Sequence, residues 1–383
     1  MVSRARKNPF TEWWWTVDRT MLGLLIVLMG IGMVLSLAAS PPVAERLPNV
    51  SSYHFVYKHA LFLPMAFIIM IGLSFLDRRT IRRLALLILA GSLVFMVVIL
   101  FIGNTINGGR RWMSVFGMSL QPAEFLKPAF VVLCAWFFSE NTRNSEIPGR
   151  LFAFLLLAVC VVLLVAQPDF GQTALLFLVW GAIFFMAGMP WLWIGGFGGV
   201  AMAGLGLAYV FIPHVTSRID RFVKEEGDNF QVDRAIESIV GGSWLGQGPG
   251  EGVVKRILPD SHTDFVFAVA AEEYGIVLCL IILGLYGTVV LKSLILSQTI
   301  KDAFTRLAIS GLAILFGLQA IINMAVTVRL MPAKGMTLPF ISYGGSSTLA
   351  IAIGMGFLLA LSRKTAEESS RLKHIRPYGQ ERV

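Results

Sequence analysis

The chain contains ten apolar runs of about 20 residues each, and these runs restrict its fold more than any other feature. They cover residues 21–39, 58–76, 83–102, 122–138, 150–167, 172–189, 191–212, 264–291, 304–328 and 340–361. A helix of about 20 residues spans a hydrocarbon core roughly 30 Å thick. A barrel would need strands of alternating polarity, which the runs lack. We therefore expect an all-α polytopic integral membrane protein with about ten transmembrane helices.

Composition and the positions of the basic residues predict the topology. The 383-residue chain is 56% hydrophobic and 14% charged, which excludes an ordinary soluble domain. An even number of spans puts both termini on one side, and the loops of that side hold most Lys and Arg residues, as cytoplasmic loops do. We expect one membrane domain over residues 1–383, with cytoplasmic segments at 1–20 and 362–383. The long loop at 213–263, between the seventh and eighth helices, then lies outside.

Within this outer loop the sequence predicts a short amphipathic helix. The apolar residues of its one face are Val232, Ala235, Ile236, Ile239 and Val240. Their helical spacing, opposite a polar face, is typical of a helix that lies along the membrane surface. The glycine-rich stretch at 241–252 lacks the lysine ending of a phosphate loop, so it predicts a mobile or closely approached backbone.

Several basic residues fall in the outer loops, against the topology rule. They are Arg110, Arg111, Arg218, Arg221, Lys224, Arg234, Lys255, Arg256, Arg329 and Lys334. Cations in this position suggest an anionic ligand. Arg110 and Arg111 offer fork-shaped donors suited to phosphate, and Trp112 can pack on a sugar ring. An aromatic and basic anchor at the membrane interface is the alternative.

Two further polar features stand at the ends of predicted spans. Glu124 and Lys127 are three residues apart, so they share a helical face and can pair. Ionisable groups in a span indicate function, but a structural pair explains these two equally well. Asp169 follows a proline between two spans, and a role in that turn is the simpler account.

Residues 258–275 read as a polar loop that continues into the eighth apolar helix. Asp264 would then lie at the outer rim of the membrane. Residues 261–264 fit a capping box, in which this carboxylate only caps the helix, and general base chemistry is an equally good interpretation. Desolvation at the rim would raise the pKa of Asp264, while nearby cations would oppose the rise. His262 is similarly ambiguous.

The last polar stretch lies at 331–347 and holds Lys334, Ser342 and Ser346. Its prolines, glycines and hydroxyl groups precede the tenth apolar run. The stretch indicates either a bent start to that helix or the polar lining of a cavity.

Four motifs together resemble the SEDS family of bacterial membrane proteins (shape, elongation, division and sporulation). They are Gly-Arg-Arg-Trp at 109–112, Gln-Pro-Ala-Glu at 121–124, Leu-Pro-Asp-Ser-His-Thr-Asp-Phe at 258–265, and Pro-Phe-Ile-Ser-Tyr-Gly-Gly-Ser-Ser at 339–347. The resemblance covers almost the whole chain. Within the family, Lys-Gly-Met-Thr-Leu-Pro at 334–339 looks like the division member more than the elongation member.

The resemblance implies a peptidoglycan glycosyltransferase that polymerises lipid II during cell division and releases undecaprenyl pyrophosphate. It implies Asp264 as the essential carboxylate and general base. The implied substrate-binding residues are Arg110, Arg111, Trp112, Glu124, Lys127, His262, Lys334, Ser342 and Ser346. The implied partners are a class B penicillin-binding transpeptidase and other division membrane proteins, at the septum of the bacterial cytoplasmic membrane. No nucleic acid or cofactor is implied, and a need for a divalent cation stays open.

Two rival functions fit the same composition. A transporter that flips lipid II would need an ionisable pathway through the spans and, as in many transporters, inverted repeats; we find no repeat in the sequence. A non-catalytic scaffold of the division machinery is the other rival. Polymer formation from lipid II by the pure protein separates the enzyme from both.

Overall fold

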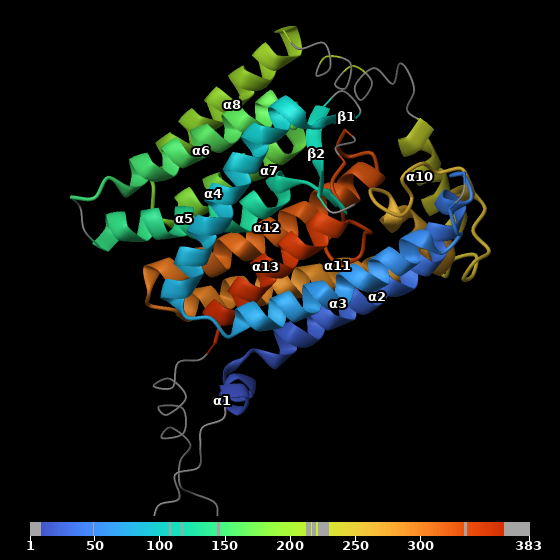
Figure 1. Ribbon diagram of the computed structural model, residues 1–383, viewed down its shortest axis with the longest axis horizontal. Coiled ribbons are helices and arrows are strands. Elements are labelled where there is room, and N and C mark those ends of the chain that lie inside the picture. The colour runs from blue at the N-terminus through green and yellow to red at the C-terminus, as the bar shows by residue number, and fades with distance from the viewer. Residues whose placement is uncertain are drawn as a thin grey trace, which may run out of the picture.

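The computed structural model describes residues 9–48, 50–106, 109–115, 118–143, 146–211, 216, 220, 230–332 and 335–363. These residues form a helical bundle (Figure 1). Its helices are α1 (Pro9–Thr16), α2 (Arg19–Ala44), α3 (His54–Ser74), α4 (Arg78–Ile102), α5 (Pro122–Arg143), α6 (Gly149–Ala166), α7 (Phe170–Met186), α8 (Trp191–Phe211), α10 (Phe230–Gly242), α11 (Val266–Thr299), α12 (Ala303–Thr327) and α13 (Gly345–Leu361), with a 3₁₀ turn at Val254–Arg256.

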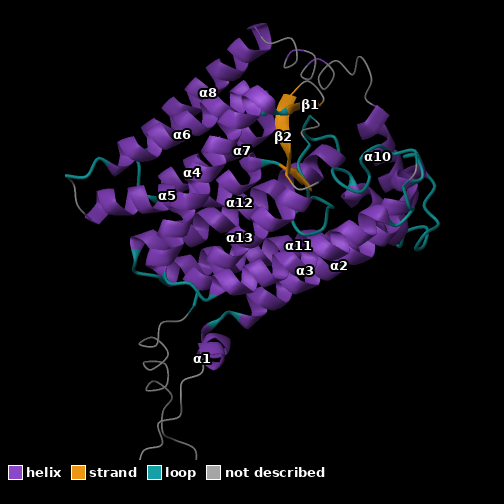
Figure 2. Ribbon diagram, in the orientation of Figure 1, coloured by secondary structure: helices purple, strands orange, loops and turns teal. Residues whose placement is uncertain are grey.

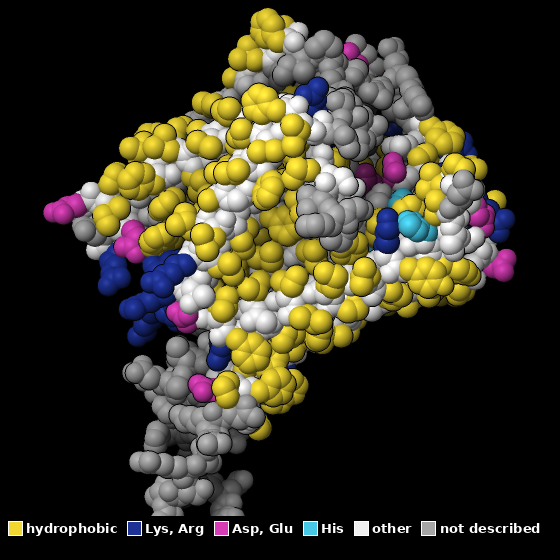
Figure 3. All heavy atoms as spheres, in the orientation of Figure 1, with side chains coloured by type: hydrophobic (Ala, Val, Ile, Leu, Met, Phe, Trp, Pro, Cys, Tyr) yellow, Lys and Arg dark blue, Asp and Glu magenta, His cyan; other side chains and the backbone are white. Residues whose placement is uncertain are grey.

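The helices confirm an all-α, multi-pass membrane protein. Each of the ten predicted apolar runs coincides over most of its length with a helix. Within the described ranges, seven helices are long and apolar enough to cross a membrane, namely α2, α3, α4, α5, α6, α11 and α12, while α7, α13 and the Gly195–Phe211 part of α8 are shorter apolar segments. The count of ten crossings stays a prediction. In Figure 3, apolar side chains cover the sides of the bundle and charged ones gather toward its ends.

Helices α5 and α12 form the centre of the bundle. In their most apolar stretches 83% and 78% of the residues are buried, against 28–50% in the other five long helices. The two helices pack on each other, and α4, α6, α7, α11 and α13 contact one or both of them. Polar side chains on α5 and α12 are therefore buried inside protein and not in lipid, which is where intramembrane polar groups are tolerated.

The two ends of the described chain lie at the same end of the bundle. Arg363, just beyond α13, donates a hydrogen bond from its Nε to the Thr16 hydroxyl at 3.0 Å. This contact agrees with an even number of crossings. Which side of the membrane the ends occupy stays a prediction, and residues 1–8 and 364–383 lie outside the described residues.

The predicted surface helix forms as α10, but it packs on α11. Ala235, Ser238 and Gly242 are its buried residues, whereas Val240 of the predicted apolar face is 72% exposed. Ser238 donates to the Glu272 carboxylate at 2.7 Å. The helix is thus held by contacts with α11, a tertiary partner that the apolar periodicity of its own sequence does not reveal.

The glycine-rich stretch after α10 is closely approached, as predicted. A Cβ at Gly275, where φ is +78° and α11 is kinked, would collide with the Trp244 carbonyl. One predicted boundary is wrong: the tenth run was expected to become helical from residue 340, but α13 begins at Gly345. Phe340 has a φ of +62°, a left-handed conformation that a right-handed helix cannot contain.

A small antiparallel sheet interrupts the helical pattern between α4 and α5 (Figure 2). It consists of β1 (Asn104–Ile106), β2 (Gly109–Val115) and β3 (Met118–Leu120), in the order β1-β2-β3. No strand was predicted here, because strands of three to seven residues are too short for a clear alternating pattern. We call the end of the bundle that carries this sheet and α10 the loop end.

Candidate active site

A cavity of about 640 Å³ lies at the loop end. Its walls come from α3, the sheet, the start of α5, the loop before α11 and the segment 335–347. It brings together five predicted site residues, which are Arg111, Trp112, Glu124, Asp264 and Ser346. These residues are up to 235 positions apart in sequence (346 − 111), so the fold assembles the site from separate motifs.

Asp264 lies in a tight turn ahead of α11 and does not cap the helix. Asp260 has a φ of +51°, and its carbonyl accepts hydrogen bonds from the N–H groups of Thr263, Asp264 and Phe265 at 3.1, 3.1 and 3.3 Å. The N-cap position is Phe265, with no capping hydrogen bond from a side chain. Ser261 instead donates to the Ala39 carbonyl at 3.5 Å. The capping-box interpretation is therefore wrong.

The carboxylate of Asp264 faces the cavity without a partner among the described residues. It is partly buried, and no hydrogen bond or ion pair reaches it from the described side chains. Burial, with a smaller contribution from the negative charge of Asp260, raises the pKa of Asp264 to about 7. We expected cations to oppose this rise; among the described residues, the neighbouring charge that contributes is another carboxylate, that of Asp260. An acid with this pKa can exchange a proton near neutral pH.

Of the two adjacent arginines, Arg111 reaches the cavity. Its Nε donates to the Gln167 carbonyl at 3.1 Å, a second N–H donates to the Pro168 carbonyl, and Nη1 lies 3.9 Å from Oδ1 of Asp169. These contacts fix the guanidinium beside the cavity. Arg110 is exposed, does not line the cavity, and donates to the Leu100 carbonyl at the end of α4 at 3.0 Å.

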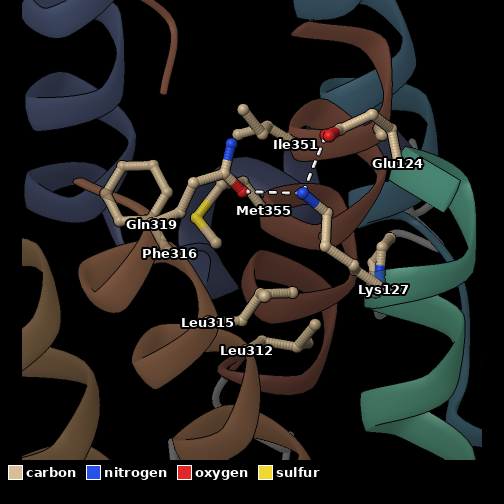
Figure 4. A pocket seen from close by; sticks show the side chains of 11 residues that line it. Glu124, Lys127, Leu312, Leu315, Phe316, Gln319, Ile351 and Met355 are labelled. Atoms are coloured by element: carbon tan, nitrogen blue, oxygen red, sulfur yellow. Dashed lines mark hydrogen bonds and ion pairs between the residues drawn. The ribbon is translucent and has the colours of Figure 1, made fainter. Parts of the chain in front are cut away.

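Glu124 and Lys127 form the predicted pair, buried between α5 and α12 (Figure 4). The Lys127 Nζ lies 2.8 Å from Oε2 of Glu124 and donates to the Gln319 Oε1 at 3.1 Å. Glu124 also accepts from Gln172 Nε2 at 2.7 Å. Of the two, only Glu124 borders the large cavity, while both line a second void of about 20 Å³. Lys127 thus holds Glu124 and does not itself reach the cavity.

His262 and Ser342 stand behind the cavity wall. The His262 ring lies between Phe55 and Tyr343, with centroids 4.4 and 5.6 Å away. Burial lowers the pKa of His262 to about 4, so the ring is neutral at pH 7. The Ser342 hydroxyl accepts from the Leu338 N–H at 2.8 Å and closes a turn. Neither residue lines the cavity, and Lys334 lies outside the described residues.

The cavity is also lined by polar residues that were not predicted as site residues. They include Lys58 and four residues of the quoted motifs, namely Gln121, Asp260, Thr337 and Tyr343. Lys58 was interpreted as the first residue of the apolar run 58–76. Its positive charge at the end of a predicted span was the feature that could have indicated a binding role. Asp169 caps α7 through the Gln172 N–H at 3.4 Å, which confirms its turn role, but it also lines the cavity.

The other described basic residues of the loop end contribute less than expected to an anion site. Lys255 is buried and paired with Glu273, Arg234 pairs with Glu237, and Arg329 lies 3.4 Å from Asp233. The Lys255–Glu273 and Arg329–Asp233 pairs join separate elements, whereas Arg234–Glu237 lies within α10. Within the described residues, no group of three His, Cys, Asp or Glu side chains could hold a metal ion.

Comparison with known proteins identifies the family. Residues 18–367 match the FtsW, RodA and SpoVE family of cell cycle proteins. A probable peptidoglycan glycosyltransferase FtsW of Caulobacter vibrioides is 46% identical over 94% of this chain and 93% of its own length. A protein of the same name from Trichlorobacter lovleyi is 32% identical over 90% of this chain and 93% of its own.

Solved structures support the same family assignment. A chain from a peptidoglycan synthase complex that coordinates polymerization and crosslinking has a TM-score of 0.75 at 27% identity, covering 90% of this chain and 97% of that one. The rod shape determining protein RodA of Thermus thermophilus has a TM-score of 0.68 at 27% identity, covering 91% and 97%. The chain therefore belongs to the SEDS family of membrane proteins and is similar in sequence to members named FtsW.

Proposed function

We propose that this protein is a peptidoglycan glycosyltransferase that polymerises lipid II at the outer face of the cytoplasmic membrane during division. Relatives named for this activity match more than nine-tenths of the chain. The observation that carries the proposal is the cavity with Asp264 in its wall. Its carboxylate lacks a partner among the described side chains and has a pKa of about 7, which suits a general base near neutral pH.

In the proposed reaction, Asp264 takes the proton of the acceptor sugar hydroxyl. The hydroxyl oxygen forms a bond to the anomeric carbon of the donor sugar as the bond from that carbon to the pyrophosphate oxygen breaks. Undecaprenyl pyrophosphate leaves with the electron pair, and the proton stays on the carboxyl group until solvent removes it. The step needs no oxidant or reductant. General base catalysis of this kind contributes roughly 100- to 10,000-fold.

Arg111 and Trp112 are placed to bind the donor. The guanidinium of Arg111 is fixed by the 167–169 turn at the edge of the cavity, so it can meet a pyrophosphate with little loss of side-chain freedom. Lys58 adds a second cation to the wall. Trp112 offers a flat surface for a sugar ring. We assign Lys127, His262 and Ser342 to support these residues, because they lie behind the wall.

We further propose a class B penicillin-binding transpeptidase as the partner, working with other division proteins at the septum, with both termini in the cytoplasm. The similar chain from a complex that couples polymerization to crosslinking supports this partner. Single-cysteine labelling tests the topology. A cysteine in place of Gly250 should react with an impermeant reagent in intact spheroplasts, and protection there would invert the assignment.

Incubation of the pure protein with lipid II tests the activity, first alone and then with the transpeptidase. We expect glycan strands and released undecaprenyl pyrophosphate in at least one condition. Movement of lipid II across vesicles without polymer would favour the transporter, and absence of both would favour the scaffold.

A further inference from the structure

Asn323 on α12 joins two separate pieces of chain at the active site. Its side chain is buried, with a residue exposure of 2%. Its Nδ2 donates to the carbonyl of Asp264 at 2.8 Å and to the carbonyl of Met336 at 2.6 Å. One amide therefore holds the loop of the proposed base and the segment that follows position 335. The sequence did not single out Asn323.

The two carbonyls need this donor because neither belongs to a helix. Near the start of α11, the N–H groups of Ala268 and Val269 both donate to the Phe265 carbonyl. The Asp264 carbonyl therefore accepts no hydrogen bond from the helix backbone. Met336 lies in a stretch without regular secondary structure before α13. Buried carbonyl groups are costly when they lack a donor. Asn323 supplies both hydrogen bonds from one position.

The segment held by Asn323 passes beside the carboxylate. Gly335 has a φ of +62°, and a Cβ on it would lie 3.5 Å from Oδ2 of Asp264, at ordinary van der Waals contact. A shift of either piece of chain would therefore change the surroundings of that oxygen. Two positions further along, Thr337 lines the cavity and shares a hydrogen bond of 2.6 Å with the Ser347 hydroxyl.

A second amide on the same face of α12 supports the same segment. Gln319, four residues earlier, donates to the Thr337 carbonyl at 3.3 Å and accepts from Lys127 at 3.1 Å, the contact drawn in Figure 4. Asn323 also leaves its Oδ1 without a hydrogen bond among the described residues. Burying amides costs free energy unless they are bonded, so α12 accepts a cost at Asn323 that an apolar residue would avoid.

We propose that Asn323 is a positioning residue for glycosyl transfer, which sets the spacing between the Asp264 loop and the 335–337 segment so that the carboxylate meets the acceptor hydroxyl. The inference rests on the proposed function. Asn323 does not line the cavity and should not touch substrate. Its loss should therefore lower kcat and leave KM nearly unchanged.

The test is Asn323→Leu, which keeps a similar volume and removes both donors. We expect kcat for lipid II polymerisation to fall about 10- to 100-fold, as misplacement by about 1 Å does, with KM within about twofold. Ser310→Ala is the matched control, because Ser310 lies on α12 like Asn323 but away from the cavity. The substitution removes its buried hydrogen bond of 2.8 Å to Ser297 on α11. Its kcat should stay within about twofold of wild type.

Three results would overturn the proposal. The first is a wild-type kcat in folded Asn323→Leu, and the second is an effect of this substitution on KM alone. The third is loss of folding in both Asn323→Leu and Asn323→Ala while Ser310→Ala folds, which would show a purely structural role. Asp264→Asn in the same assay separates the two ideas. If that variant polymerises normally, the proposed base is wrong; if it is inactive while Asn323→Leu is fully active, only the positioning role fails.

Discussion

Asp264 lies just before α11, and the pair Glu272–Glu273 lies about two helical turns further along the chain. The carboxylates of the pair are bonded by protein groups, whereas that of Asp264 is not bonded by any described side chain. Glu272 accepts hydrogen bonds from the N–H groups of Val254 and Lys255 at 2.7 and 2.9 Å and from Ser238 at 2.7 Å. Glu273 pairs with the buried Lys255. No described side chain bonds the Asp264 carboxylate, which faces the cavity.

This difference separates structural carboxylates from one that is available for chemistry. Glu272 and Glu273 use their charge to fasten the loop end onto α11, and their hydrogen bonds leave little capacity for a substrate. No side chain in the described part of the chain bonds the Asp264 carboxylate, and its burial raises its pKa. Function is expected where a local rule of pairing is broken, as at Asp264, whereas Glu272 and Glu273 are bonded to the loop that they hold.

The largest effect is expected for Asp264→Asn. Asn has the shape of Asp but no ionisable oxygen, so polymerisation should fall by roughly 100- to 10,000-fold while folding and partner binding persist. Lipid II polymerisation beside thermal unfolding measures both. Asp264→Glu is the control, since it keeps the charge and moves it by about one bond length, which can cost about 100-fold.

Glu273→Gln should have the reverse profile. It leaves Lys255 charged and buried without its partner, which typically costs about 3–5 kcal/mol of stability. Denaturant or thermal unfolding in detergent measures the loss. The exposed pair Arg234–Glu237 gives the control: Glu237→Gln should cost no more than about 1 kcal/mol. Equal costs would mean that the buried pair does not fasten the loop end.

A smaller effect is expected at the arginine that lines the cavity. Arg111→Gln should weaken kcat/KM for lipid II by about 1.5–3 kcal/mol, or roughly 10- to 150-fold, for a lost charged hydrogen bond. Arg110→Gln is the matched control, because Arg110 is exposed and stands outside the cavity wall. A larger loss for Arg110 than for Arg111 would move the proposed pyrophosphate site to the exposed face of β2.

The sequence predicted those features that follow from spacing along the chain. Apolar length placed the helices, and the three-residue spacing of Glu124 and Lys127 predicted their pair. It did not reveal Asn323, since a single amide inside an apolar run has no periodic signature. The position of His262 between Phe55 and Tyr343 depends on residues about 200 and 80 positions away in the sequence, which local patterns do not encode.

The choice between capping and catalysis for Asp264 also required the fold. Both roles favour a carboxylate just before a helix, so residue type and position could not separate them. The turn at Asp260 decides it, because that turn satisfies the local N–H groups and leaves the Asp264 side chain directed to the cavity.

The most direct test of the central claim is the pH dependence of kcat/KM for lipid II polymerisation by the wild-type protein, because it reports the free enzyme's essential groups. Asp264 must be ionised to act as a base, so activity should rise with pH through an apparent pKa of about 7 and fall about tenfold per unit below it. The residual activity of Asp264→Asn should lack this rise with pH, which forms the acidic limb of the profile. A wild-type profile that stays flat down to about pH 5, or a limb that persists in the Asn variant, would contradict the account.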